Sequence, residues 1–183
     1  MQEDYKHIVF SKNVIEVITV ANDICIFLEE FDSFELNYSL LYLQKALPLL
    51  YLKSALLPDI ENNHKEANER FITQEQWEDI FVKANSKLGN KDTFYMVDEV
   101  SNKAAEVLQS SIAECLADIY QDLKDFLLLY QKNTITAQEN AVYFTKILFE
   151  THWGAKLINV HSAIHSLIYK SYSSTSFLSF SAN

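Results

Sequence analysis

Four acidic residues have the spacing of a single helical face. Glu114, Asp118, Asp122 and Asp125 follow one another at steps of four, four and three residues, and residues at such steps lie on one side of an α-helix. The row falls roughly opposite the apolar seam of the same segment. One interpretation is therefore a solvated outer face, as amphipathic helices commonly carry.

The C-terminal end of this row favours a second interpretation. Residues 126–130, FLLLY, are apolar on every side, so this end of the helix is expected to be enclosed. Asp122 and Asp125 would then line a polar cleft or interaction surface, and buried carboxylates need a cation or an arginine. Arg70 is the natural partner, because it is the sole arginine and its planar fork binds carboxylates.

Two histidines are spaced by one helical turn. His161 and His165 could bind a divalent metal from one helix, but two ligands do not complete a site. Candidate additional ligands are His152, His64, Glu150 and the aspartate row. The competing interpretation is a pair of histidines at the edge of the core, hydrogen-bonded to neighbours. A carboxylate-bridged di-iron site needs two Glu-x-x-His motifs on helices. Only residues 61–64 match this motif, and they lie in an expected loop, so a di-iron site is disfavoured.

The composition argues against several common enzyme classes. Among 183 residues there are only 2 glycines and 2 prolines, and no glycine-rich phosphate loop or nucleophile elbow is present. No nucleophile beside a base can be recognised, and no cofactor motif is evident. The catalytic residues are therefore unknown, and the sequence favours a role other than catalysis.

Charge and cysteine usage limit the partners and the compartment. Fifteen basic residues against 25 acidic ones give a net charge of −10, which disfavours nucleic acid and favours a protein partner, one of basic character in particular, or a cation. The first residues lack the pattern of a secretory signal. Cys25 and Cys115 lie on apolar helical patterns and are expected to be buried and reduced in the cytoplasm, although a disulfide between them stays open.

The elements that position these residues are organised around an apolar stretch. Residues 40–57, LLYLQKALPLLYLKSALL, are apolar with few interruptions, and those interruptions make the run a poor membrane span. We expect it to form the central, buried helix of a soluble core. Pro48 should kink this helix, since proline lacks the amide proton and crowds the preceding turn.

Periodicity and capping signals predict an all-α single domain of about five main helices. Four capping boxes are predicted, at Asp32 with Glu35, Thr73 with Gln76, Ser111 with Glu114 and Thr136 with Glu139. The expected helices span residues 10–31, 33–57 with the kink, 74–88, 111–132 and 136–169. In the last of these, Gly154 would mark a bend or a close helix crossing.

Two segments fall outside this helical pattern. Residues 90–110 are ambiguous, with a mildly helical pattern over 100–109. The domain should cover residues 1–170, and the serine-rich residues 171–183 should form a flexible tail.

Four stretches carry a family resemblance. They read ALPLLYLKSALLP, RFITQEQWEDIF, LADIYQDLKDFLLLYQ and HWGAKLINVHSAIHSL. The chain resembles a bacterial family of compact all-helical cytoplasmic proteins that is classed as a domain of unknown function. The resemblance implies a helical bacterial protein, and it supplies no activity and no site residues.

Three functional hypotheses follow. The first is a non-enzymatic interaction or regulatory domain that presents an acidic surface to a protein partner. The second is a metal-binding bundle protein or metal-dependent enzyme that uses His161, His165 and carboxylates of the facing helix. The third is a small-molecule sensor with a pocket beside Pro48. The sequence does not indicate an oligomeric state.

Overall fold

The structure, a computed structural model, describes residues 7–61, 69–98 and 106–176. It confirms the all-α class. The helices are α1 (Lys12–Glu29), α2 (Leu36–Ala55), α3 (Gln74–Leu88), α4 (Ile112–Tyr130), α5 (Ile135–Leu148) and α6 (Gly154–Ser176). A small antiparallel hairpin of β1 (Thr93–Asp98) and β2 (Glu106–Ser111) precedes α4.

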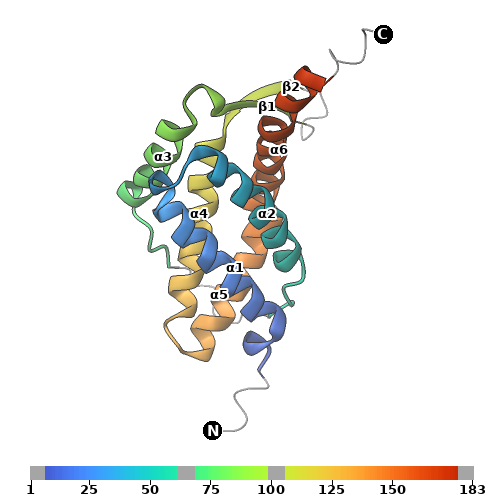
Figure 1. Cartoon of the computed structure of the whole chain (residues 1–183). Coiled ribbons are helices and arrows are strands. Elements are labelled where there is room, and N and C mark those ends of the chain that lie inside the picture. Colours follow the sequence, from blue (N-terminus) through green and yellow to red (C-terminus); the bar gives the residue numbers. More distant parts are fainter. Residues whose placement is uncertain (1–6, 62–68, 99–105, 177–183) are drawn as a thin grey trace.

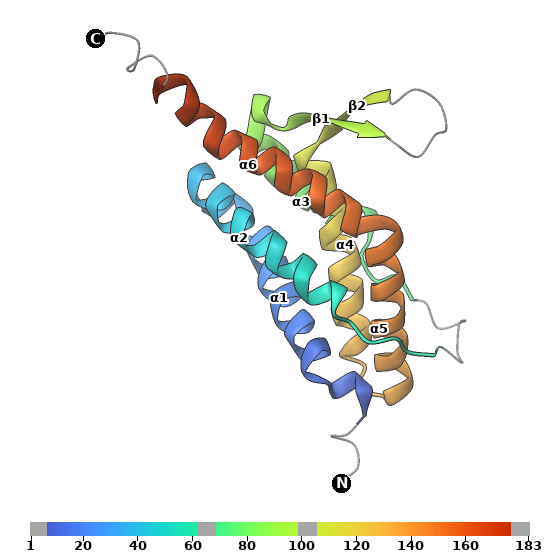
Figure 2. The ribbon, with the colours of Figure 1, turned by 90° about the vertical axis from the view of Figure 1, so that its right-hand side faces the viewer.

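Helix α4 is the centre of the bundle. It packs against α1, α3, α5 and α6, and Figure 1 shows it surrounded by the other helices. Helix α2 instead packs against α1 and α6 and lies at one edge (Figure 2). The expectation that residues 40–57 form the central helix is therefore wrong, because an apolar helix surface does not determine how many neighbours cover it.

In two of the four predicted capping boxes, the cap side chain accepts a hydrogen bond from the amide three residues later, as predicted. At the start of α3, Thr73 Oγ accepts from the Gln76 amide at 3.3 Å and Gln76 Oε1 accepts from the Thr73 amide at 3.0 Å. At the start of α4, Ser111 Oγ accepts from the Glu114 amide at 3.0 Å. These side chains satisfy amides that the first helical turn leaves unpaired.

The other two predicted boxes are wrong. Residues Phe31–Ser33 form a 3-10 turn, so α2 begins only at Leu36, without a side-chain cap. Helix α5 is capped two residues earlier than predicted, by Thr134, whose Oγ accepts from the Ala137 amide at 3.2 Å. At α5 the chain offers two threonines near the helix start, Thr134 and Thr136, and the helix begins after the earlier one.

The last predicted helix, 136–169, is two helices joined by a π-helical turn. Residues Phe149–Trp153 form this turn, and the Gly154 amide donates to the Phe149 carbonyl. Figure 2 shows α5 and α6 running in different directions on either side of it. A Cβ atom on Gly154 would lie 2.3 Å from the Phe149 carbonyl oxygen. The bend expected at Gly154 is present, and the close backbone approach explains why glycine stands there.

Helix α2 runs without interruption through Pro48. Its buried residues lie on one side: Ser39, Leu40, Leu43, Leu47, Leu50 and Ser54. This side faces α1 and α6, against which α2 packs most extensively in the described part of the chain. The proline is accommodated inside the helix, and the backbone acceptor that it leaves unpaired receives a donor from α6, as described below.

Strands β1 and β2 form a hairpin that the sequence did not reveal. Phe94 pairs with Ser110 and Met96 with Leu108, so the mild helical pattern over 100–109 was misleading for residues 106–109. At the base of the hairpin, Asp92 accepts from the Ala113 amide at 2.7 Å and from Ser111 Oγ at 2.6 Å. The hairpin projects from the helical body, on the side away from α2 (Figure 2).

The C-terminal helix extends further than predicted. Helix α6 continues to Ser176, into the segment that was expected to be flexible from residue 171, and residues 177–183 lie outside the described part of the chain. Within that part, none of the helices combines the length and the apolar character that a membrane crossing requires.

Candidate functional site

The acidic row of α4 changes from solvated to buried along the helix. Glu114 is exposed and Asp118 is half-buried, whereas Asp122 and Asp125 are 3% and 6% exposed. The solvated-face interpretation is therefore wrong for the last two aspartates, and the alternative, an enclosed polar group at this end, describes them.

Arg70 contacts both buried aspartates, as the sequence suggested. Its Nη1 atom lies 2.6 Å from Asp122 Oδ1 and 3.1 Å from Asp125 Oδ2. Burial opposes the charge of the guanidinium, but the hydrogen bonds to the two carboxylates outweigh it and raise the pKa of Arg70. A charged arginine therefore balances two buried carboxylates, although through one nitrogen rather than through its fork.

Each aspartate of the row joins elements that are distant in sequence. Asp125 Oδ1 accepts from the backbone amides of Phe71 and Ile72 at 2.7 and 2.9 Å, which holds the segment before α3 against α4. Asp122 Oδ2 lies 2.7 Å from His152 Nδ1, in the π-helical turn.

Asp118 acts in the same way one helical turn earlier. Its Oδ1 atom accepts from Trp77 Nε1 of α3 at 2.9 Å, and its Oδ2 atom accepts from Lys156 Nζ of α6. The cavity beside Arg70 measures about 20 Å³, which is room for roughly one water molecule. Among the described residues, the row thus holds the segment before α3, helix α3, the π-helical turn and helix α6 against α4.

The two predicted metal-ligand histidines have other contacts. His161 Nε2 lies 3.2 Å from the backbone carbonyl of Gln44. Since Pro48 has no amide proton, this carbonyl lacks its helical donor, and His161 supplies one. His165 instead packs against Tyr169, with ring centroids 4.7 Å apart.

No third ligand joins the histidine pair in the described parts of the chain. Within residues 7–61, 69–98 and 106–176, no three His, Cys, Asp or Glu side chains are grouped as a metal site would require. His152 contacts Asp122, and His64 lies outside these ranges. The structure therefore gives His161 a defined role in the fold, as the donor that compensates for Pro48.

The two cysteines are buried and free, as expected. Burial raises the pKa of Cys25 to about 12, and burial likewise raises the pKa of Cys115. Both thiols therefore stay protonated and unreactive at neutral pH, because the thiolate is the reactive form.

The surface feature that the sequence interpretation missed is a second apolar face on α2. We call it the outer stripe; its members are Tyr38, Leu41, Lys45, Leu49, Leu52 and Leu56. All six are exposed, Tyr38 by 56% and Leu52 by 55%. At about 100° per residue this stripe lies nearly opposite the buried side of α2. The stretch 40–57 is almost continuously apolar because it carries two apolar faces.

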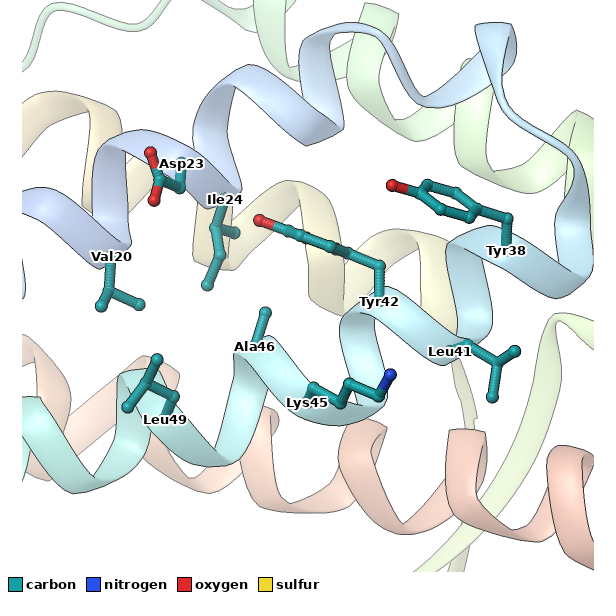
Figure 3. Close-up of a pocket in the computed structure, with 9 residues that line it drawn as sticks. All are labelled: Val20, Asp23, Ile24, Tyr38, Leu41, Tyr42, Lys45, Ala46 and Leu49. Carbon is teal, nitrogen blue, oxygen red and sulfur yellow. The ribbon is translucent and has the colours of Figure 1, made fainter.

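An apolar groove lies beside the outer stripe, between α1 and α2. It has a volume of about 480 Å³ and is lined by Val20, Asp23, Ile24, Tyr38, Leu41, Tyr42, Lys45, Ala46 and Leu49. Figure 3 shows Val20 and Ile24 of α1 facing Ala46 and Leu49 of α2. Leu49, the residue after Pro48, lines this groove, and the sensor hypothesis expects a pocket beside Pro48. Sensing itself stays a prediction.

The outer stripe could have been found from the sequence. The steps of three and four from Tyr38 to Leu56 are visible in the printed residues, and the same steps describe the buried side. Two such sets on one helix indicate two apolar faces. The sequence interpretation instead took the whole run as buried, because leucine is commonly an interior residue.

Comparison with known proteins places the chain in a family. Residues 8–170 match the family model described as "Domain of unknown function (DUF5063)". The crystal structure of protein BF1032 from Bacteroides fragilis is similar, with 35% sequence identity and a TM-score of 0.79 over 89% of this chain and 96% of that chain. No curated protein matches. The family resemblance is thus confirmed: the chain belongs to the DUF5063 family.

Proposed function

We propose that this protein is an interaction domain that binds a protein helix along the outer stripe of α2. The observation that carries the proposal is the row of exposed apolar side chains at helical spacing, bordered by an apolar groove. Steps of three and four residues are the spacing with which one helix packs against another. Contiguous exposed apolar surface of this kind marks interaction sites on soluble proteins.

The energetic reason is the apolar area that a partner would cover. Leu41, Leu49, Leu52 and Leu56 are each about half exposed. Full burial of a leucine side chain stabilises by about 1.5–3 kcal/mol, so covering the exposed half contributes roughly 1 kcal/mol for each of them. The sum is enough to offset much of the entropy lost on association.

The acidic surface supports an interaction role less strongly. An open hollow at the α3 side is bordered by four carboxylates, those of Glu29, Glu75, Glu78 and Asp79. Glu29 already pairs with Lys124 at 2.6 Å, and Asp79 pairs with Lys83 at 2.7 Å. Half of its acidic groups are therefore neutralised within the chain, so we place the partner on α2 rather than here.

A photo-crosslinking experiment tests the proposal. Benzoylphenylalanine is placed at position 52 on the outer stripe, or at position 82 on α3, and the protein is irradiated in its native host cells. Val82 is the matched control, because its exposure of 56% is close to the 55% of Leu52. We expect an adduct of discrete mass from position 52 and none from position 82.

A second variant shows whether the adduct depends on the stripe. Leu49→Glu places a charge within the apolar row but leaves position 52 exposed, so it should abolish the adduct. Absence of any adduct at position 52, equal adducts at both positions, or an adduct that survives Leu49→Glu would each refute the proposal.

A further inference from the structure

We infer that the helix bound on the outer stripe is α2 of a second copy of this chain. The two helices would pack antiparallel, and the two-fold axis would cross the outer stripe between Lys45 and Leu49. The inference rests on the proposed function and names its partner. It is carried by the spacing of the stripe, by the distribution of charge along α2 and by the size of the surface.

The spacing of the outer stripe is almost the same in both directions. A two-fold interface places the same surface patch of each copy against the other, so the patch must be complementary to itself. In an antiparallel helix pair, facing residues have a constant sum of residue numbers. Tyr38 with Leu56 and Lys45 with Leu49 both give 94, and Leu41 with Leu52 gives 93.

These pairings join compatible side chains. Leu41 meets Leu52 of the second copy, and Tyr38 meets Leu56, so apolar surface covers apolar surface. Lys45 meets Leu49, where its aliphatic stem can cover the leucine while its ammonium group stays in water. Each pairing is made twice, once on either side of the axis, as a two-fold interface requires.

The outer stripe carries little charge compared with the rest of the surface: its one charged residue is Lys45, whose ammonium group can stay in water. The chain has a net charge of −10, yet no Asp or Glu lies between Leu36 and Leu57. Two α2 helices therefore approach each other without bringing helix carboxylates together, whereas like charges elsewhere on the surface would oppose contact. A basic partner helix would find few acidic groups here, since Asp23 is the carboxylate that lines the groove.

The size of the stripe fits a weak, reversible dimer. From Tyr38 to Leu56 the helix rises about 27 Å at 1.5 Å per residue. A strip of this length and the width of one helix is at the lower end of specific interfaces. We therefore expect a dimer of micromolar affinity, with subunits that exchange readily.

Sedimentation equilibrium tests the dimer. Over a range of about 1 to 300 µM, chosen to bracket a micromolar Kd, the wild-type mass should rise from one chain towards two. Leu52→Glu should stay at the mass of one chain throughout, because it buries a charge within the apolar contact, opposite Leu41 of the second copy. Val82→Glu, at an equally exposed site on α3, should behave as wild type, and circular dichroism verifies that both variants are folded.

Disulfide cross-linking tests the antiparallel register. Leu41→Cys mixed with Leu52→Cys should form a disulfide between copies, because these positions face each other in the proposed pair. Either variant alone should not, since two copies of residue 41 lie about 18 Å apart along the axis and two copies of residue 52 about 15 Å. The native cysteines are buried and do not compete.

The outcomes separate this inference from the proposed function. Wild-type protein that stays at the mass of one chain, or cross-linking of each variant with itself but not with the other, overturns the inference. An adduct at position 52 of twice the chain mass supports both statements. An adduct of another mass together with a monomeric protein keeps the interaction function and removes self-pairing, and absence of both adduct and dimer removes the two together.

Discussion

Asp125 shows how a buried carboxylate is stabilised in this fold. It accepts hydrogen bonds from Arg70 Nη1 and from the amides of Phe71 and Ile72, and it is 6% exposed. A charge in such a place is costly unless donors surround it. The three donors belong to one short segment, so a single side chain fixes the chain that leads into α3.

Removal of this side chain should destabilise the protein strongly. Asp125→Ala leaves two buried amides without an acceptor and Arg70 with one partner fewer, so the free energy of unfolding should fall by about 3–5 kcal/mol. Asp125→Asn keeps an acceptor oxygen and should lose less. Urea denaturation measures both values.

Glu114 is the control on the same helical row. It is exposed and lies in the first turn of α4, where a carboxylate contributes about 0.3–1 kcal/mol through the helix dipole. Glu114→Ala should therefore cost no more than this. If Asp125→Ala also cost less than about 1 kcal/mol, the clamp role of the aspartate row would be wrong.

At the scale of elements, α2 and α6 are linked by one hydrogen bond that a proline makes necessary. Pro48 leaves the Gln44 carbonyl without its helical donor, and His161 Nε2 lies 3.2 Å from that oxygen. Because a carbonyl only accepts, Nε2 must carry the proton, which defines the tautomer of the neutral ring. The proline in α2 and the histidine in α6 should therefore depend on each other.

A double-mutant cycle measures this dependence. His161→Ala should lower the free energy of unfolding by about 1–3 kcal/mol, because a part-buried acceptor loses its donor. In a Pro48→Ala background the helix supplies its own amide to Gln44, and the same substitution should cost about 1 kcal/mol less. Urea unfolding of the four proteins gives the coupling energy, and packing lost with the imidazole cancels between the two backgrounds. Zero coupling would show that the histidine does not serve the Gln44 carbonyl.

At the scale of the whole molecule, α4 is the helix on which the others depend. It contacts four other helices, and its buried residues occur along its whole length. In the described part of the chain, helix α2 packs mainly against α1 and α6 and has an exposed face. Regions with fewer buried contacts open more readily than the centre of a fold.

Hydrogen exchange should reveal this order. The Leu52→Glu variant is used because the proposed contact of α2 should be absent from it. In this variant we expect amides of α4 to exchange only through global unfolding, and those of α2 to exchange faster, through partial opening. Mass spectrometry of peptides from the two helices measures the difference. Equal protection of α2 and α4 would mean that the bundle opens as one unit.

Several features followed from the sequence alone because they depend on neighbouring residues. Steps of three and four residues predicted the helices, and the boxes at Thr73 and Ser111 marked two of their starts. The contact of Arg70 with Asp122 and Asp125 was also foreseeable, since a buried carboxylate needs a cation and the chain has one arginine. Burial of both cysteines followed from their apolar surroundings.

The tertiary structure decided the features that depend on distant parts of the chain. The hairpin exists because β1 pairs with β2, and such pairing leaves only a weak local signal in the sequence. The bend before Gly154 depends on the close approach of that residue to Phe149. The two apolar faces of α2 are present in the sequence, but only packing against α1 and α6 determined which of them is covered. Periodicity shows which sides of a helix are apolar, and the neighbouring helices determine which side is left exposed.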